Sequence, residues 1–508
     1  MLLKLTTFLI LLLPIFSNAQ QQYFSKRYDF NSSQYENGFN ILPYDSGYIS
    51  WNMSSLDSLS GRCKIVVNFL DSVGNILQTK VFDHSTGNNF AGGFGTICQT
   101  YDSGFAMAGS IVYPNGNSNA TLWKFDHVGD TLWYREFGDT LYQSALQCKQ
   151  TRDKGFIIAG ITYSYSIYGD ILLIKTDSTG LLLWEKHLGG IDRDVAFSID
   201  TCFDGGFIIG GYTWSYGVNP LTDFANAYLI KTDSLGDFQW QTVLGDSYDD
   251  RFYFVLQCSD GNFISCGHFT TFDPFAHCCH GYQLPTIIKF DSLGSIIWQK
   301  SYGPALANTF LFKIKELSDG KLIACGAVKD TLSMIFTSDG LAIKVESNGD
   351  SLWYRNYDSF GPDDYSVFYD ISNDSDDGLI CTGWFSPYSP DTGTQDIWVL
   401  KLDSNGCEIS NCLTSGIELI SLSQKRILYA YPNPFISQVT IETTLTEDSK
   451  SQQLIISDII GQKLKVYSLK AGQNQVNIST DYLQTGIYFA SLLSEGKVLS
   501  TVRLMKTN

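Results

Sequence analysis

Residues 204–240, with the sequence DGGFIIGGYTWSYGVNPLTDFANAYLIKTDSLGDFQW, contain the pattern that recurs along most of the chain. An acidic turn at Asp204 opens an apolar run, a polar and aromatic loop follows, and a second apolar run ends at Asp233. Gly236 suits the positive φ of a tight hairpin, and a third run restarts at Phe238. Short β-rich runs between turn signals predict strands, so we expect the repeated unit to be made of β-structure.

Two glycines of this stretch recur at a regular spacing. The glycine of the first turn recurs as Gly47, Gly104, Gly155, Gly206, Gly261, Gly320 and Gly378. The hairpin glycine recurs as Gly74, Gly129, Gly180, Gly236, Gly294, Gly349 and Gly406. Both series advance by roughly 50–60 residues, a period typical of a propeller or a solenoid. Because both series have seven members, the sequence predicts seven units.

Each unit is expected to form one antiparallel sheet of four strands. In the fourth copy we expect these strands at residues 196–202, 206–214, 227–233 and 238–245. Four antiparallel strands that repeat radially form the blade of a β-propeller. The predicted fold class is therefore all-β, with a seven-bladed β-propeller as the main domain.

An isolated strand near the amino end is expected to complete the last blade. Residues 22–29 match the fourth strand of a repeat but have no repeat ahead of them. The seventh copy, in contrast, stops at Cys407 and lacks a fourth strand. We predict that the N-terminal strand pairs with the seventh copy and closes the ring, which leaves no unpaired sheet edge.

Large aromatic residues begin the fourth strand of five copies: Trp133, Trp184, Trp240, Trp298 and Trp353. We expect each of them to pack between neighbouring blades. The spacing Asp-x-x-Gly-x-x-x-Trp resembles the tryptophan-docking repeat of pyrroloquinoline-quinone-type propellers. In that family the motif is structural and many members bind no quinone, so the resemblance supports the fold and says little about chemistry.

The first 19 residues have the features of a secretory signal peptide. A positive start at Lys4 precedes an apolar centre at residues 8–16 and a small-residue site at 17–19. A transmembrane helix needs about 20 apolar residues, and no later stretch supplies them. We expect a signal peptide at 1–19, removed before Gln20, and a soluble, exported protein.

Charge and cysteine content narrow the classes of partner and the redox setting. The formal net charge of −18 disfavours nucleic acid and anionic lipid as main partners. Twelve cysteines in an exported chain permit disulfides. Cys407 and Cys412 could form a disulfide at the exit from the ring or remain free thiols, and Cys266 and Cys325 are expected to be small buried thiols.

A different module follows the repeats. We place the propeller at 20–412, a linker at 413–427 and a small C-terminal β-sandwich at 428–508, because short alternating strands are separated there by Gly and Asn turns. The motifs in this module are YPNPF at 431–435, VTIE at 439–442, LIISDIIG at 454–461 and LQTGIY at 483–488.

These motifs resemble the C-terminal sorting domain, type A, of the type IX secretion system of Gram-negative bacteria. The resemblance implies that residues 428–508 are recognised by an outer-membrane translocon and are usually removed. We therefore expect the type IX secretion machinery as a partner, and a location in the medium or on the cell surface.

One face of the propeller is the expected ligand surface. Strands alternate direction, so the loop between strands two and three lies beside the loop that leads to the next blade. The first set of loops is aromatic and the second acidic, and the candidate ligand-binding residues are Trp214, Tyr216, Trp384, Tyr388, Asp249 and Asp250. Aromatic rings can stack on a sugar while carboxylates accept its hydroxyls; alternatively, the rings cover loop backbone and the acids cap turns.

Neither a catalytic centre nor a metal site is predicted. The sequence His277-Cys278-Cys279-His280 could bind zinc, but adjacent ligands do not easily occupy a tetrahedron, and a vicinal disulfide, or disulfides to other cysteines, is at least as plausible. The hairpin acids lack the ligand spacing of a calcium loop. No Ser-His-Asp order, phosphate-cradling loop or HExxH motif is present.

The sequence thus predicts an exported propeller that acts as a binding or adhesion module for a glycan or a protein, without a cofactor. The first alternative is an enzyme on the ring, either a glycan hydrolase or lyase or a quinoprotein. The second is a structural component of the cell surface. Fold does not decide among the three.

Overall fold

The computed structural model describes residues 23–30, 35–55, 63–83, 87–91, 96–139, 141–217, 224–245, 248–271, 282–303, 308–330, 337–358, 365–374, 377–387, 395–408, 428–431, 435–443, 452–458, 462–469, 475–480, 482–494 and 497–506. Every regular element in these residues is a β-strand, as predicted. The chain divides into two compact units, Met1–Lys300 with Leu306–Ser415, and Ser301–Ala305 with Gly416–Asn508.

The first unit contains four separate sheets of four consecutive antiparallel strands. They are β2 (Glu36–Tyr44), β3 (Gly47–Ser54), β4 (Lys64–Leu70) and β5 (Ile76–Phe82); β11 (Gln143–Gln150), β12 (Phe156–Thr162), β13 (Asp170–Thr176) and β14 (Leu182–Leu188); β15 (Asp194–Thr201), β16 (Phe207–Thr213), β17 (Asn226–Thr232) and β18 (Phe238–Leu244); β19 (Arg251–Gln257), β20 (Phe263–Thr271), β21 (Tyr282–Phe290) and β22 (Ile296–Ser301). The strands of the fourth copy agree with their predicted bounds to within two residues.

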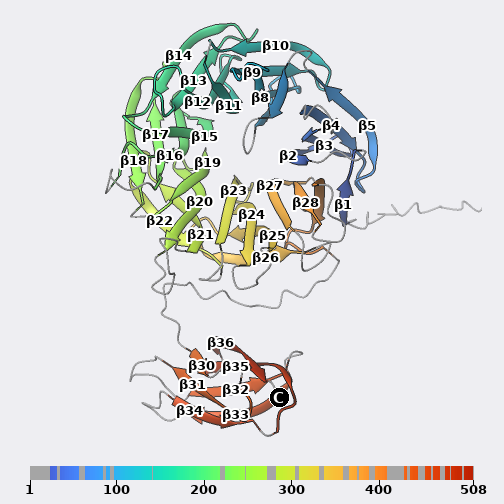
Figure 1. Cartoon of the computed structure of the whole chain (residues 1–508), viewed down its shortest axis with the longest axis vertical. Helices are drawn as coiled ribbons and strands as arrows, with labels where there is room; N and C mark the ends of the chain where they lie inside the picture. Colours follow the sequence, from blue (N-terminus) through green and yellow to red (C-terminus); the bar gives the residue numbers. More distant parts are fainter. Residues whose placement is uncertain are drawn as a thin grey trace, which may run out of the picture. The chain divides into compact units, whose positions relative to one another are not determined.

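Two further sheets complete this unit. One has five strands, β6 (Asn88–Ala91), β7 (Ile97–Gln99), β8 (Phe105–Val112), β9 (Ser118–Phe125) and β10 (Thr131–Phe137). The other has eight, β1 (Phe24–Tyr28), β23 (Asn308–Glu316), β24 (Leu322–Asp330), β25 (Thr337–Val345), β26 (Ser351–Tyr357), β27 (Tyr365–Asn373), β28 (Leu379–Ser386) and β29 (Asp396–Leu402). A parallel pairing of Ser338 with Tyr365 joins the group β23–β26 to the group β27–β29 with β1. Figure 1 shows the sheets around a common centre, with β11, β15, β19 and β23 innermost.

Strand β1 occupies the fourth-strand position beside β29, although it comes from the amino end. Phe24 of β1 pairs with Lys401 of β29, in the register in which Trp184 of β14 pairs with Lys175 of β13. Strand β2 then contacts the same sheet, since Asn40 Nδ2 donates to Asp370 Oδ2 at 2.9 Å. The predicted pairing of the N-terminal strand with the last repeat is confirmed.

Aromatic rings from one sheet cover the hairpin glycine of the next sheet. Gly236 has φ +77°, and a Cβ there would lie 2.6 Å from the Trp184 ring. The same contact joins Trp133 to Gly180, Trp240 to Gly294, Trp298 to Gly349, and Trp353 to Gly406. In the first sheet, where Gln78 replaces tryptophan, Phe69 covers Gly129, and Phe24 of β1 covers Gly74. Only glycine combines this positive φ with so close an approach.

The acid of the first turn is a structural partner of a buried lysine. Lys231 near the end of β17 is 4% exposed and lies 2.8 Å from Asp204. Equivalent pairs are Lys124–Asp102, Lys175–Asp153 and Lys289–Asp260. A Cβ at Gly206 would collide with the carbonyl oxygen of Thr232, so this glycine is required for close strand approach. The positive φ of the turn falls instead on the residue before it, Gly205 (φ +85°).

The second unit consists of two sheets that share one apolar core. Strands β30 (Leu428–Tyr431), β31 (Gln438–Thr443) and β34 (Gln475–Ser479) form one sheet, and β32 (Gln452–Ser457), β33 (Lys463–Leu469), β35 (Gly486–Ser494) and β36 (Lys497–Lys506) form the other. Val439 and Ile478 from the first sheet pack with Leu454, Leu492 and Leu504 from the second. This arrangement agrees with the predicted sandwich, whereas the predicted signal peptide (1–19) and linker (413–427) lie outside the described residues.

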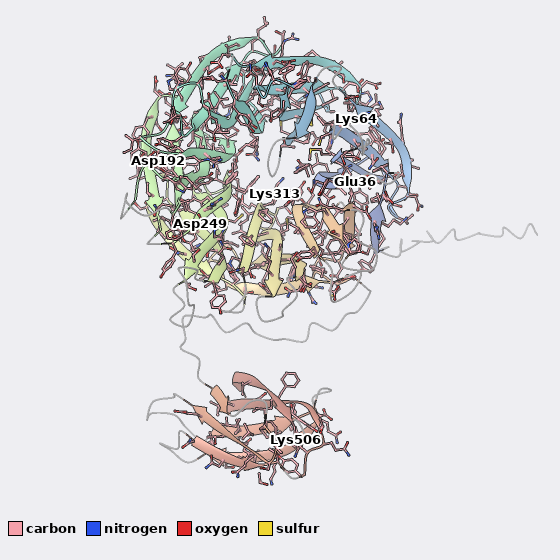
Figure 2. The ribbon with its side chains drawn as sticks, in the orientation of Figure 1. Glu36, Lys64, Asp192, Asp249, Lys313 and Lys506 are labelled. Carbon is pink, nitrogen blue, oxygen red and sulfur yellow. The ribbon has the colours of Figure 1, made fainter. Side chains whose placement is uncertain are left out.

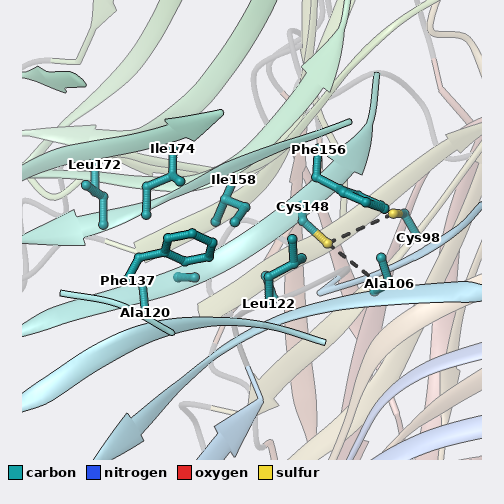
Figure 3. Packing of buried hydrophobic residues seen from close by; sticks show 12 residues of the cluster. Cys98, Ala106, Ala120, Leu122, Phe137, Cys148, Phe156, Ile158, Leu172 and Ile174 are labelled. Atoms are coloured by element: carbon teal, nitrogen blue, oxygen red, sulfur yellow. Dashed lines mark hydrogen bonds between the residues drawn. The ribbon is translucent and has the colours of Figure 1, made fainter. Parts of the chain in front are cut away.

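Most described cysteines are free and buried. Cys266 and Cys325 are fully buried, as predicted, and burial raises the pKa of both thiols. Cys98 and Cys148 lie with their Sγ atoms 3.9 Å apart in the core between two sheets (Figure 3). Cys407 is disulfide-bonded, while Cys412, its predicted partner, lies outside the described residues.

Candidate functional site

The aromatic loop after β16 and the acidic loop before β15 lie together, as the alternation of strand direction predicts. The hydroxyl of Tyr216 donates to the carbonyl oxygen of Gly189 at 2.8 Å. The amide of Asp192 donates to Ser215 Oγ at 2.9 Å, and Ser215 Oγ donates to Asp194 Oδ2 at 2.7 Å. We call the surface formed by such loop pairs the loop face.

Trp214 is half-buried on the loop face, between a cation and another ring. The guanidinium carbon of Arg193 lies 6.0 Å from its ring centroid, and the Tyr212 ring lies 6.4 Å away. The indole Nε1 of Trp214 is buried and has no hydrogen-bond partner among the described residues. Tyr216 stands beside it, and burial, followed by the charge of Asp194, raises the pKa of the Tyr216 hydroxyl.

Asp249 and Asp250 lie one sheet further on and differ in accessibility. Asp249 is 26% exposed and holds Arg251 at 2.9 Å and the His268 ring nitrogen at 3.3 Å. Burial opposes its ionisation, but these partners lower the pKa of Asp249 below its usual value. Asp250 is 1% exposed and accepts the amide of Thr270, in β20, at 2.7 Å.

Trp384 belongs to β28, in the eight-stranded sheet. Its indole nitrogen donates to the hydroxyl of Tyr369 at 3.1 Å. Tyr388 lies outside the described residues, together with the 277–280 motif. The structure therefore describes five of the six candidate ligand-binding residues: Trp214, Tyr216, Trp384, Asp249 and Asp250.

A row of aromatic rings that the sequence reasoning missed connects the two tryptophans. Phe197, Tyr253, Phe312, Tyr369 and Phe39 follow one another with centroid separations of 5.2, 5.1, 5.4 and 5.7 Å. Phe197 continues to Tyr212 at 5.5 Å and so to Trp214, while Tyr369 binds Trp384. We call this row, from Trp214 to Trp384, the aromatic arc.

The arc exists because five strands, β2, β15, β19, β23 and β27, are irregular at the same place. Each of its five central residues is the one skipped in the pairing register, as Phe197 is between Ala196 and Ser198. An extra residue of this kind forms a β-bulge, which re-aims its side chain and is common next to binding sites. The available signal was an aromatic residue eight or nine positions before the first-turn glycine.

Cationic and anionic groups accompany the arc. The Arg251 guanidinium carbon lies 4.5 Å from the Tyr212 centroid, and Lys329 Nζ lies 5.7 Å from that of Phe310, which stacks on Phe312. Asp249, labelled in Figure 2, balances Arg251. The arc therefore offers apolar ring surface with charged hydrogen-bonding groups at its border.

Two buried carboxylates converge below the loop face beside Gly189. A Cβ on Gly189 would lie 2.7 Å from an Asp194 oxygen and 2.8 Å from an Asp170 oxygen. Burial, and then the charge of Asp194, raise the pKa of Asp170, and burial also raises that of Asp194. Each carboxylate keeps an Oδ1 atom without a hydrogen-bond partner among the described residues.

In the described part of the chain, Asp29, Glu36 and Asp396 form a group whose carboxylate oxygens all lie within 4.8 Å of one another. The guanidinium of Arg27 pairs with Asp396. Phe30 and Ser54 also donate to Glu36 Oε1, at 3.0 and 3.1 Å. These protein groups already compensate negative charge there, and we assign no metal ion to the group.

Comparison with known proteins identifies the C-terminal module. Residues 429–506 match a family model described as a secretion system C-terminal sorting domain. This domain indicates export across the outer membrane to the cell surface or the extracellular space, handled by the type IX machinery. The sequence matches no curated protein. No helix in the described residues is long and apolar enough to span a membrane.

Several solved structures are similar to the chain at low identity. The polysaccharide lyase Uly1 has 8% identity and a TM-score of 0.43, over 76% of this chain and 93% of that one. The apocarotenoid oxygenase of Synechocystis has 11% identity and a TM-score of 0.38, over 75% and 94%. Sqt1 of Chaetomium thermophilum has 10% identity and a TM-score of 0.35, over 71% and 84%. Likenesses this weak contribute nothing to the functional argument.

Proposed function

We propose that residues 20–412 form a seven-bladed β-propeller closed by β1, after a signal peptide at 1–19 and before a linker at 413–427 and the sorting domain at 428–508. The register of β1 on β29 supports closure, because it repeats that of β14 on β13. Seven hairpin glycines, each covered by an aromatic ring from another repeat, support the count. The resemblance to quinone-type repeats concerns these docking contacts and brings no cofactor with it.

We further propose that the exported propeller is a binding or adhesion module whose ligand is a glycan. The aromatic arc from Trp214 to Trp384 carries this proposal. Phe39, Phe197 and Phe312 are only half-buried, and the CH groups of sugar units can stack on the ring surface that they expose. Tyr216, Asp249 and Tyr388 are proposed to supply hydrogen bonds to hydroxyl groups, with Asp250 holding the loop that presents Asp249.

Charge balance at the border of the arc favours a neutral glycan. Arg251 is compensated by Asp249 at 2.9 Å, so neither leaves a large local field for a charged partner. The overall charge of −18 opposes polyanions at long range. A protein ligand stays the alternative within the same proposal, and enzyme or surface-layer roles predict different outcomes below.

A glycan array with the secreted protein tests the proposal. We expect binding to one class of neutral polysaccharide, with a loss of tenfold or more for Trp214→Ala and for Trp384→Ala. Tyr101→Ala is a matched control, since Tyr101 is 66% exposed and lies outside the arc. Equal binding by all four proteins would overturn the assignment of the arc, and release of shorter products would favour a hydrolase or lyase.

Export has its own test. Deleting residues 428–508 removes the sorting domain, so we expect the truncated chain to accumulate in the periplasm while the full chain reaches the medium or the cell surface. Fractionation and immunoblotting measure the distribution. Secretion of the truncated chain at the level of the full chain would contradict recognition through this domain.

A further inference from the structure

The first strands of the sheets surround a cavity of about 480 Å³ in the first unit, which we call the axial cavity. Its walls come from β2, β7, β11, β15, β19, β23 and β27, strands far apart in the sequence. Leu42, Ile97, Leu256 and Ile371 give it apolar walls. A cavity of this size suits a small organic ligand.

Two of the three lysines that line the axial cavity are ion-paired, and its acids accept hydrogen bonds from protein groups. Lys149 lies 3.1 Å from Asp200, and Lys313, labelled in Figure 2, lies 2.8 Å from the buried Asp370. Glu316 accepts hydrogen bonds from the amide and hydroxyl of Ser259 at 2.7 and 3.0 Å. These acids are therefore already bound by protein groups.

Lys315 is the exception. It lines the cavity on β23, two residues after Lys313, and its ammonium group has no hydrogen bond or ion pair with any described residue. Burial, and then the nearby charge of Lys313, lower the pKa of Lys315, and the charge of Asp370 offsets only part of this effect. A half-buried ammonium without a partner is costly, and an anion at hydrogen-bonding distance would remove that cost.

We propose that the axial cavity binds a small organic monocarboxylate, with its carboxylate on Lys315 and its hydrocarbon part on the apolar walls. Among the lysines of the cavity, Lys315 alone has no ion pair with a described residue, and a carboxylate brings it a single negative charge, whereas a phosphate monoester would bring about −1.5 to −2 at neutral pH. This site is separate from the aromatic arc and does not rest on glycan binding. Its failure would leave the arc proposal intact, and the reverse also holds.

Calorimetric titration of the full protein with phenylacetate and hexanoate, each beside its neutral amide, tests the site. We expect at least one carboxylate to bind at least tenfold tighter than its amide, which is about 1.4 kcal/mol. Lys315→Gln should remove the difference. Lys186→Gln, on the outer strand β14, should keep it. No preference for either carboxylate, or a preference that survives in Lys315→Gln, would overturn the proposal.

A second measurement uses the unmodified protein and so does not depend on how Lys315→Gln folds. Lysines are acetylated with trace acetic anhydride at pH 8 and quantified by mass spectrometry. We expect the bound carboxylate to slow acetylation of Lys315 severalfold, while its amide does not and Lys186 is unaffected by either. Equal acetylation of Lys315 with and without carboxylate would contradict the site.

Discussion

Two junctions between sheets share a backbone frame and differ in charge. The closing junction lies between the β1–β29 pair and the sheet β2–β5, and the internal junction lies between the sheets β11–β14 and β15–β18. Phe24 covers Gly74 in the first as Trp184 covers Gly236 in the second. The pairing registers make Asp396 and Asp170 equivalent, and likewise Arg27 and His187.

The difference lies in how the buried acids are compensated. At the closing junction the guanidinium of Arg27 pairs with Asp396, beside Glu36. At the internal junction no guanidinium of the described residues forms an ion pair with Asp170 or Asp194, and the pKa values of both acids are raised. Packing is therefore repeated from junction to junction, while the charges are specific to each, and the following changes test that distinction.

Removing β1 should have the largest effect, because it destroys the closing junction alone. Without residues 20–30, β29 has an unpaired edge and the buried Trp398 loses its hydrogen bond to Ser25. We expect a loss comparable with the total stability of a domain, about 5–15 kcal/mol, seen as aggregation or non-cooperative urea unfolding. A synthetic peptide of residues 20–30 should restore cooperative unfolding. A deletion variant as stable as the full chain would contradict the structural role of β1.

Adding a methyl group at the hairpin glycine under the aromatic ring should lower the free energy of unfolding by the same amount at both junctions. We expect Gly74→Ala and Gly236→Ala each to lower the free energy of unfolding by about 3 kcal/mol, from the positive φ and the overlap with a ring. Gly261→Ala is the control, since it has φ +85° but nothing within 4 Å, and should cost about 1 kcal/mol. Urea denaturation measures all three. Equal losses at the three positions would show that the ring contact contributes nothing.

Removing the guanidinium should affect the closing junction and not its counterpart. Arg27→Gln leaves the fully buried Asp396 without its cation, and we expect a loss of about 2 kcal/mol, below the ~3–5 kcal/mol typical of fully buried pairs, since Arg27 is 38% exposed. The control His187→Gln at the equivalent position should cost less than about 1 kcal/mol. A larger loss for His187→Gln would reverse the comparison.

Neutralising one acid of the internal junction should stabilise the protein slightly. The pKa of Asp170 is higher in the folded than in the unfolded protein. Its protonated form therefore stabilises the fold below the usual Asp pKa of about 4, and this stabilisation is lost as the pH rises. Asp170→Asn should therefore raise stability by about 1 kcal/mol at pH 7 and leave it unchanged below about pH 4. The reciprocal variant Asn226→Asp, beside Asp250, should be destabilising at pH 7. Thermal unfolding across this pH range decides, and a gain independent of pH would contradict the electrostatic cause.

The fold was largely predictable because its signals are local and repeated. The turn and hairpin positions, such as Gly236, require glycine because the backbone has a positive φ or because another group approaches closely. The same requirement recurs from copy to copy. The pairing of β1 followed from two complementary defects in the repeat. Asp204 and Lys231 recur in other copies, but the sequence did not show that the two side chains meet, because a loop of variable length separates the turn from the strand that carries the lysine.

The candidate site was less predictable because it depends on irregularity. Trp214 and Trp384 were singled out from loop composition, but the residues that connect them, such as Tyr253, occupy β-bulges that strand patterns conceal. Asp250 was grouped with Asp249, yet its backbone contact buries it. No sequence motif marks Lys315. That it lacks an ion pair can be seen only once the partners of Lys149 and Lys313 are known.

The pairing of β1 with β29 also sets the order of events during folding. Ser25 and Trp398 are 373 residues apart in the chain, so the first strand to leave the ribosome must wait for almost the last strand of its unit. The entropy of closing so long a loop grows only slowly with length, but contacts this distant in sequence slow folding. Until that closure occurs, both β1 and β29 expose hydrogen-bonding edges to other chains, which makes the growing polypeptide a natural client for chaperones.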